Sequence, residues 1–244
     1  MVILPARDEG PRVGGVVAEL RRVVPGVEIV VVENGSGDDT AERASAAGAT
    51  VLRSDIGYAR ALRVGFAHAH AKNAPWVVTV DADGQHPATA VPELLRALND
   101  ADLVVGSRFL GAAGYPVTPI RRAANRGLAA WASWLAGHPL TDVTSGLRAM
   151  RPAVYESFAA DYPPDVADAN VLVRAVRAGW RVREVPVAMH AREGGRSQHD
   201  SPRAVWFAVR MAQLCLREAG RRALPEPRDA ARAGISAGIS AGRA

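Results

Sequence analysis

The sequence predicts an α/β fold in which helices flank a mostly parallel central sheet. First, its 244 residues, 48% of them hydrophobic, are enough to bury one sizeable core. Second, short apolar runs alternate with segments that repeat apolar residues at helical spacing. Third, polar clusters follow several of these runs, and open parallel sheets bind ligands beyond the carboxyl ends of their strands. Repeated strand–helix units of this length build a doubly wound sheet.

The first half of the chain alternates strands and helices. The continuous apolar run 27–32 is typical of a parallel strand covered on both faces, and Pro25-Gly26 ends the helix before it. The strands that we expect span 2–4, 27–32, 50–52, 76–79 and 103–105. The helices that we expect between and after them span 13–24, 38–47, 59–71 and 91–98.

The second half of the chain is less regular. Its apolar spacing predicts helices over 121–135, 166–178 and 204–216 and a strand over 182–187. From about Gly220 the chain is rich in Arg, Pro and Ala and ends in a repeat of Ala-Gly-Ile-Ser, a composition typical of disorder. We therefore expect one domain over residues 1–218 and a disordered tail over 219–244.

Composition narrows the partners and the location. A net charge of +5 favours anionic partners, such as a nucleotide, a phosphate or an anionic lipid. Aromatic residues make up only 5% and no basic stretch is interleaved with them, so no nucleic-acid partner is expected. The single cysteine, Cys215, excludes internal disulfides and cysteine metal clusters. Without a membrane-spanning segment or a basic leader, we expect a cytoplasmic protein, soluble or peripheral on the inner face of the cell membrane.

The segment 80–87, Val-Asp-Ala-Asp-Gly-Gln-His-Pro, carries the strongest functional signal. Asp81 and Asp83 lie one residue apart where a buried strand gives way to a loop, so both carboxylates can reach one hard cation. Such a cation, Mg²⁺ or Mn²⁺, prefers oxygen ligands and usually shares them with substrate phosphates. Gln85 adds a neutral oxygen two residues later. The alternative is an Asp-rich turn that caps the helix starting near Thr89.

Further motifs follow in a fixed order along the chain. They are Pro5-Ala6-Arg7-Asp8-Glu9, Val32-Glu33-Asn34-Gly35-Ser36, Asp81-Ala82-Asp83-Gly84-Gln85-His86-Pro87, Gly106-Ser107-Arg108, Asp142-Val143-Thr144-Ser145-Gly146-Leu147-Arg148, Glu184-Val185-Pro186-Val187, and Arg192 with Gly195 and Ser197. Over about residues 2–217 the chain thereby resembles the GT-A-fold inverting glycosyltransferases of family 2, which include dolichyl- and polyprenyl-phosphate mannose synthases. The resemblance implies a Rossmann-like GT-A sheet and a hexosyltransferase that uses Mg²⁺ or Mn²⁺. The sugar would pass from GDP-mannose or a UDP-sugar to polyprenyl phosphate with inversion.

The resemblance also implies four groups of site residues. The donor nucleotide would contact Pro5, Arg7, Glu9, Val32, Asn34, Asp81 and Ala82. Phosphate groups or the acceptor would contact Arg108, Arg122, Asp142, Arg148, Arg192 and Gln198. The metal would be held by Asp81, Asp83 and Gln85, with His190 as a further candidate ligand. The catalytic candidates are Asp83, which supports the departing diphosphate, and Asp165 or Asp168 as a general base.

Departures from the family pattern bear on the donor base and on the acceptor. Arg7 replaces the usual Tyr, and Asn34 replaces an Asp that contacts the base, which leaves the base preference open. Asp168-Ala169-Asn170 lacks the Glu that serves hydroxyl acceptors in many relatives. A phosphate monoester needs no such base, because its second pKa lies near roughly 6. This departure favours a lipid phosphate, whereas Gln198 in place of a Lys argues against one.

Several alternatives stay open. The acceptor can be a hydroxyl of a cell-wall glycan or small molecule, with Asp165 or Asp168 as the base. The chain can also be a non-catalytic nucleotide-sugar-binding protein, or a nucleotidyltransferase with a similar sheet. The amphipathic helix expected over 204–216 either packs on the domain or lies on a membrane surface, aided by Arg203, Arg210 and Arg217.

Overall fold

The computed structural model describes residues 1–110, 119–164, 166–190 and 203–221. The expected tail therefore lies outside the described residues from position 222 onwards. The strands of the first half are β1 (Val2–Ala6), β2 (Ile29–Glu33), β3 (Thr50–Arg53) and β4 (Val77–Thr79). The helices between them are α1 (Gly10–Val23), α2 (Thr40–Ala46) and α3 (Tyr58–Ala71). This alternation confirms the strand–helix units predicted for residues 1–79.

The rest of the described chain adds three strands and five helices. The strands are β5 (Leu103–Ser107), β6 (Arg148–Met150) and β7 (Val182–Pro186). The helices are α4 (Val91–Ala97), α5 (Pro119–Ala136), α6 (Pro152–Ala160), α7 (Ala169–Arg177) and α8 (Arg203–Ala219). A short 3-10 turn, Ala88–Ala90, leads into α4. Of the described helices, none is long and apolar enough to cross a membrane.

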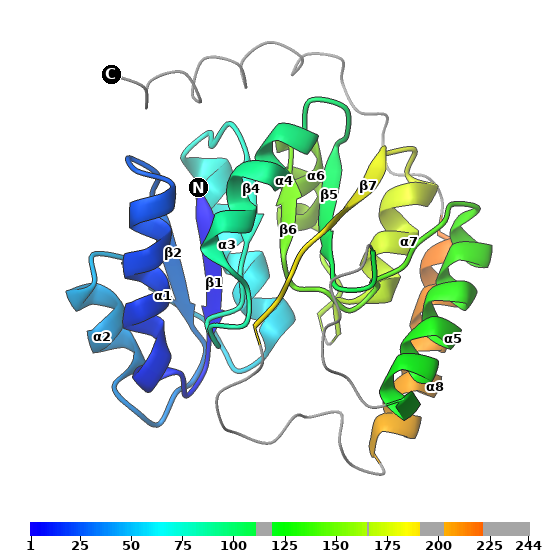
Figure 1. Ribbon diagram of the computed structural model, residues 1–244, viewed down its shortest axis with the longest axis horizontal. Helices are drawn as coiled ribbons and strands as arrows, with labels where there is room; N and C mark the ends of the chain where they lie inside the picture. Colours follow the sequence, from blue (N-terminus) through cyan, green and yellow to red (C-terminus); the bar gives the residue numbers. More distant parts are fainter. Residues whose placement is uncertain (111–118, 165, 191–202, 222–244) are drawn as a thin grey trace.

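The seven strands form one sheet in the order β3-β2-β1-β4-β6-β5-β7 (Figure 1). All neighbouring pairs are parallel except those of β6, which runs antiparallel to both β4 and β5. The expected mostly parallel α/β sheet is therefore confirmed. The carboxyl ends of β1, β2, β4 and β5 share one edge, and β6 starts from that same edge because its direction is reversed.

Two hydrophobic clusters cover the two faces of the sheet, and alternate residues of a strand serve each of them. On β1, Ile3 packs with the cluster of α3 and of α5 to α8. Its neighbours Val2 and Leu4 pack with the cluster of α1, α2 and α4. Cys215 is fully buried in the first cluster.

The sequence patterns missed β6 and α6 and placed the start of α7 three residues too early. β6 is only three residues long and opens on Arg148, which interrupts the apolar run that marks a strand. Pro152 at the start of α6, followed by buried Val154 and Phe158, is a helix signal that was present in the sequence. In front of α7, the Asn170 side chain accepts from the backbone N–H of Asp168 at 2.9 Å, which keeps that residue outside the helix.

Candidate active site

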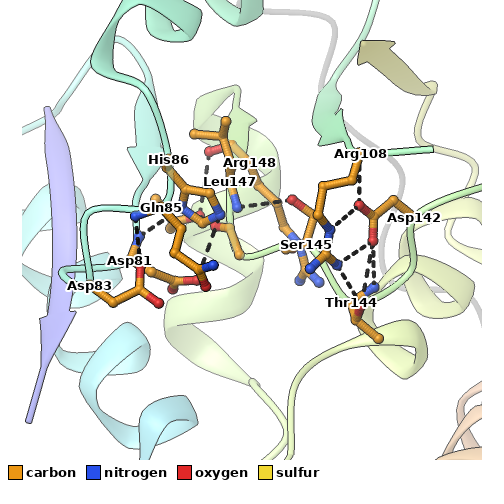
Figure 2. Close-up of polar contacts among 12 residues, drawn as sticks. Asp81, Asp83, Gln85, His86, Arg108, Asp142, Thr144, Ser145, Leu147 and Arg148 are labelled. Carbon is orange, nitrogen blue, oxygen red and sulfur yellow. Dashed lines mark hydrogen bonds and ion pairs between the residues drawn. The ribbon is translucent and has the colours of Figure 1, made fainter. Parts of the chain in front are cut away.

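The two acidic residues of segment 80–87 lie where β4 ends. Figure 2 shows Asp81 and Asp83 side by side in the loop, with Gln85 and His86 beside them. Asp83 accepts a hydrogen bond from the backbone N–H of Gln85 at 3.1 Å. Gly84 between them adopts φ 77°, a conformation that glycine reaches without strain. This tight turn brings both carboxylates to the carboxyl edge of the sheet.

Three neighbours surround Asp81. The hydroxyl of Tyr58 donates to Asp81 Oδ1 at 2.9 Å, and the backbone N–H of Asp81 donates to Nδ1 of His86 at 3.1 Å. Because Nδ1 accepts, the described ring carries its proton on Nε2, which lies 3.8 Å from Asp81 Oδ2. The third neighbour is Gly146, where a Cβ atom would lie 2.6 Å from both carboxylate oxygens. Asp81 is therefore held against the backbone that leads into β6.

Gln85 joins the carboxylate loop to the segment that follows β7. The backbone N–H of His190 donates to the carbonyl of Gln85 at 2.9 Å, and Gln85 Nε2 donates to the carbonyl of His190 at 3.4 Å. The structure thus brings both predicted ligands to the loop of Asp81 and Asp83. The imidazole of His190 is exposed, and its role as a ligand stays a prediction.

The donor set of this loop fits a cation that is bound together with substrate. Across the described ranges, no three or more His, Cys, Asp or Glu side chains gather closely enough to hold a metal. Asp81 and Asp83 offer two carboxylates instead. Mg²⁺ is commonly held by one or two carboxylates with substrate phosphates completing the coordination. The oxygens of a bound diphosphate would supply the remaining ligands of the cation.

Arg108 and Asp142 form a buried ion pair beside the loop. The Arg108 side chain donates to both carboxylate oxygens of Asp142 at 2.7 Å, and Arg108 also donates to Thr144 Oγ1 at 2.7 Å. Asp142 is fully buried, which corrects its predicted contact with the acceptor: its carboxylate neutralises Arg108 inside the protein. The phosphate contact predicted for Arg108 stays a prediction.

Arg148 is the first residue of β6 and is only 4% exposed. Its guanidinium donates to the backbone carbonyls of Ser145 at 2.9 Å and of Ala167 and Asp168 at 3.4 Å. These bonds hold the buried guanidinium in place, and its predicted phosphate contact stays a prediction. In Figure 2 the segment of Arg148 lies between the cluster of Asp81 and that of Arg108.

Asp168 precedes α7, and the charges of Arg148 and Asp81 act on its carboxyl group. Burial raises the pKa of Asp168 to about 6, and the nearby positive charge of Arg148 opposes this rise. The negative charge of Asp81 acts in the same direction as burial. A carboxyl group whose pKa lies near the working pH is suited to accept a proton. The structure therefore places one of the two predicted bases in the site, while Asp165 lies outside the described residues.

The two segments predicted to bind the nucleoside lie together at the ends of β1 and β2. The backbone N–H of Gly37 donates to Asp8 Oδ1 at 2.8 Å, and the N–H of Asp8 donates to the Ser36 hydroxyl at 3.2 Å. Asn34 is buried and donates to the carbonyl of Ala6 at 3.1 Å. Its Oδ1 accepts from the N–H of Gly57 at 3.5 Å. The Asn34 amide therefore braces three segments, and a base contact would compete with these bonds.

The remaining predicted site residues divide by exposure. Pro5 and Val32 are buried partners in the β1–β2 pair, and Ala82 is buried as well; their predicted contacts with the nucleotide stay predictions. The side chain of Arg7 is half exposed, whereas that of Glu9 is mostly covered and pairs with Arg12.

Arg122 is exposed on α5, and its predicted phosphate contact stays a prediction. Arg192 and Gln198 lie outside the described residues.

Sequence reasoning missed Tyr58, because no local pattern indicates that the first residue of α3 contacts the loop at the end of β4. It also missed the close approach of Gly146, although this glycine stood in a quoted motif.

Comparison with known proteins agrees with this arrangement. Residues 1–123 match the family described as Glycosyl transferase family 2. The dolichyl-phosphate hexose transferase of Haloferax volcanii is 30% identical over 220 residues, 89% of this chain and 94% of that protein. The undecaprenyl-phosphate mannosyltransferase of Micrococcus luteus is 30% identical over 213 residues, 81% of this chain and 86% of that protein.

A solved structure supports the fold. The glucosyl-3-phosphoglycerate synthase of Mycobacterium tuberculosis, crystallised with Mn²⁺, uridine diphosphate and phosphoglyceric acid, superposes with a TM-score of 0.66. The match covers 93% of this chain and 79% of that chain at 21% identity. At this identity the likeness concerns the fold, and it confirms the GT-A arrangement implied by the motifs.

Proposed function

Because the chain belongs to glycosyl transferase family 2 and is a glycosyltransferase, we propose that it transfers a sugar from a nucleoside-diphosphate sugar to polyprenyl phosphate with inversion. The observation that carries the proposal is the pair Asp81 and Asp83 at the carboxyl edge of the sheet. The names of the Haloferax and Micrococcus relatives support a lipid phosphate as acceptor. The Mn²⁺ and uridine diphosphate bound to the mycobacterial synthase support a metal-dependent nucleotide donor.

The carboxylates would hold Mg²⁺ or Mn²⁺ against the diphosphate, with Gln85 and His190 beside them. A bound cation supplies positive charge that offsets the charge developing on the departing nucleoside diphosphate. Asp81 is oriented by Tyr58 and Gly146, so its oxygens are already in place when the donor arrives.

In the proposed reaction, an acceptor phosphate oxygen forms a bond to the anomeric carbon from the face opposite the leaving group. The bond from that carbon to the diphosphate oxygen breaks, and the electron pair leaves with the nucleoside diphosphate. A phosphate monoester is largely dianionic at neutral pH, so no protein group has to remove a proton.

Product analysis tests the proposal directly. The full chain is incubated with undecaprenyl phosphate, Mn²⁺ and GDP-mannose, UDP-glucose or another nucleotide sugar in turn. We expect a lipid-linked monosaccharide with one of these donors and no product in the presence of EDTA. Transfer to hydroxyl acceptors, with no lipid-linked product from any donor, would contradict the lipid-phosphate proposal.

A hydroxyl acceptor is the second candidate, and the raised pKa of Asp168 favours it. In this reaction the Asp168 carboxylate would remove the proton of the attacking hydroxyl. Activity would then rise with pH through about 6, as this carboxyl loses its proton.

Replacing Asp168 by asparagine separates the two acceptors. Transfer to a hydroxyl is expected to fall by about 100- to 10,000-fold, because the base is lost. Transfer to a lipid phosphate should stay within about tenfold of wild type, because no base is needed. Turnover of each acceptor, measured as release of nucleoside diphosphate, distinguishes them. Asp100→Asn, at an exposed position, is the matched control and should change neither rate.

The same Asp168→Asn variant is expected to be more stable at neutral pH. The folded protein binds the Asp168 proton more tightly than the unfolded chain, so wild type loses stability as the pH rises from about 4 to about 6. The asparagine side chain does not ionise, and the gain near pH 7 should be about 1–2 kcal/mol. Urea unfolding at pH 4.5 and pH 7.5 measures it. Equal stability of both proteins at the two pH values would contradict the raised pKa.

We also propose that α5 and α8 contact the cytoplasmic face of a membrane. Trp131 and Trp134 stack on α5 with ring centres 5.3 Å apart, and Trp134 is 71% exposed. On α8, Val209 and Leu216 are more than half exposed. Exposed tryptophans are typical of membrane interfaces. The segment of α5 contains arginines but no acidic residue, which suits an anionic lipid surface.

Replacing Trp134 by alanine tests this contact. Sedimentation with phosphatidylglycerol vesicles should show binding about tenfold weaker than wild type, because a large apolar surface is removed. Binding to neutral phosphatidylcholine vesicles, which lack the charge attraction, is expected to be weak for both proteins. Unchanged binding of the variant to the anionic vesicles would count against this surface.

A further inference from the structure

Tyr58 joins the first turn of α3 to the carboxylate loop after β4. Its hydroxyl donates to Asp81 Oδ1 at 2.9 Å, although the two residues lie 23 positions apart. Gly57 in front of it adopts φ 141°, a conformation that side-chain-bearing residues rarely take. The backbone N–H of Gly57 also donates to Oδ1 of the buried Asn34 at 3.5 Å. This hydrogen bond connects the start of α3 to the end of β2, and the connection directs Tyr58 towards Asp81.

The ring of Tyr58 lies between solvent and a small cavity, and the residue is 37% exposed. This cavity has room for about one water molecule and is shared with Thr79, Gly146 and Arg148.

The restraint acts on one of the two proposed metal ligands. Asp81 Oδ1 accepts from Tyr58, and both oxygens face the backbone at Gly146. Each carboxylate oxygen has about two lone-pair sites, so Oδ1 can accept from the hydroxyl and still face a cation. Asp83 differs, because its oxygen accepts from the N–H of Gln85 within its own loop. The orientation of Asp81 thus depends on a residue of another element.

We propose that Tyr58 is a positioning residue for the metal site: its hydroxyl holds the Asp81 carboxylate in the orientation that binds the divalent cation. The inference rests on the proposed metal-dependent transfer and goes beyond it by assigning the orientation of Asp81 to α3. Groups that orient a metal ligand typically contribute 10- to 100-fold to metal affinity or activity. Because Tyr58 touches Asp81 and not the reacting atoms, it acts through metal binding.

The test is the affinity of the Tyr58→Phe variant for Mn²⁺. The full chain is titrated with Mn²⁺ in the presence of saturating UDP or GDP, whichever nucleotide supports Mn²⁺ binding by wild type. The electron paramagnetic resonance signal measures the Mn²⁺ that remains free. We expect Tyr58→Phe to bind Mn²⁺ about 10- to 100-fold more weakly. In turnover assays, the Mn²⁺ concentration for half-maximal activity should rise by a similar factor, whereas kcat at saturating Mn²⁺ should change much less.

Tyr155→Phe is the matched control. It also removes a hydroxyl that donates a hydrogen bond, here to the carbonyl of Ala74 at 2.6 Å, from α6 and away from the carboxylate loop; Tyr155 is fully buried, whereas Tyr58 is 37% exposed. This variant is expected to lose stability but to keep the Mn²⁺ affinity of wild type. Thermal unfolding of both variants identifies any general loss of structure.

The outcomes separate the inference from the function on which it rests. If wild type binds no Mn²⁺ with either nucleotide, the proposed metal-dependent transfer fails and the inference fails with it. If wild type binds Mn²⁺ and Tyr58→Phe binds it within about twofold, only the positioning role of Tyr58 is overturned. Equal weakening in Tyr58→Phe and Tyr155→Phe would also overturn it, because the effect would then follow from packing.

Discussion

Replacing Asp83 by alanine is expected to lower kcat for sugar transfer by on the order of a thousandfold. The variant keeps a single carboxylate at the end of β4, so the charge on the departing diphosphate loses much of its support. The fold should survive, because the bond from Gln85 to Asp83 lies within one loop and contributes only about 1 kcal/mol. Release of nucleoside diphosphate at saturating donor and Mn²⁺ measures the loss.

Asp100→Ala is the control for this variant. Asp100 is 78% exposed and its nearest cation, Arg183, is 3.6 Å away, so its removal should leave turnover unchanged. Should Asp83→Ala retain more than about a tenth of the wild-type rate, the paired carboxylates would not be the centre of the reaction.

Gly146→Ala is expected to reduce Mn²⁺-dependent turnover by about 100-fold without unfolding the protein. A Cβ atom at this position would lie 2.6 Å from both oxygens of Asp81, so the carboxylate has to turn away. Its bond with Tyr58 would break at the same time. Measurements of kcat and of Mn²⁺ affinity, together with the unfolding temperature, separate a displaced ligand from a damaged fold.

Gly127→Ala provides the matched glycine control. Gly127 is exposed on α5, and apart from its chain neighbours and the nearby backbone of its own helix, nothing in the described structure lies within 4 Å of the position that its Cβ would take. Alanine there should raise stability by up to about 1 kcal/mol, because it is the better helix former, and leave turnover unchanged. Full activity in Gly146→Ala would show that Asp81 tolerates another orientation.

Local patterns predicted the parallel part of the fold well, because each strand there is a continuous apolar run followed by a helix of clear spacing. Val30 and Val31 of β2 face opposite clusters and are both fully buried, which explains the uninterrupted run. β6 could not be predicted in this way. It is held by strands from distant parts of the sequence, and its first residue is a buried arginine whose partners are backbone carbonyls.

The sequence predicted proximity within the site where one motif held the relevant residues. Asp81, Asp83 and Gln85 come from a single loop, so their proximity follows from the sequence. What the structure adds is the burial of charged residues, which the sequence does not show. Asp142 and Arg148 looked like candidate contacts for ligands, but the first is enclosed with Arg108 and the second with carbonyl groups. Sequence alone cannot show which charge is neutralised inside the protein.

The reversed direction of β6 has a consequence for engineering this enzyme. The chain leaves the sheet after Ser107 and returns at Arg148, and these two points lie beside each other because β5 and β6 are neighbours. The excursion between them therefore has both ends on one rim of the sheet, and it includes Gly146, which lies against Asp81. Chimeras that exchange this segment between relatives should therefore keep the Arg108–Asp142 ion pair and Gly146 within the transplanted piece, so that Asp81 meets the same backbone.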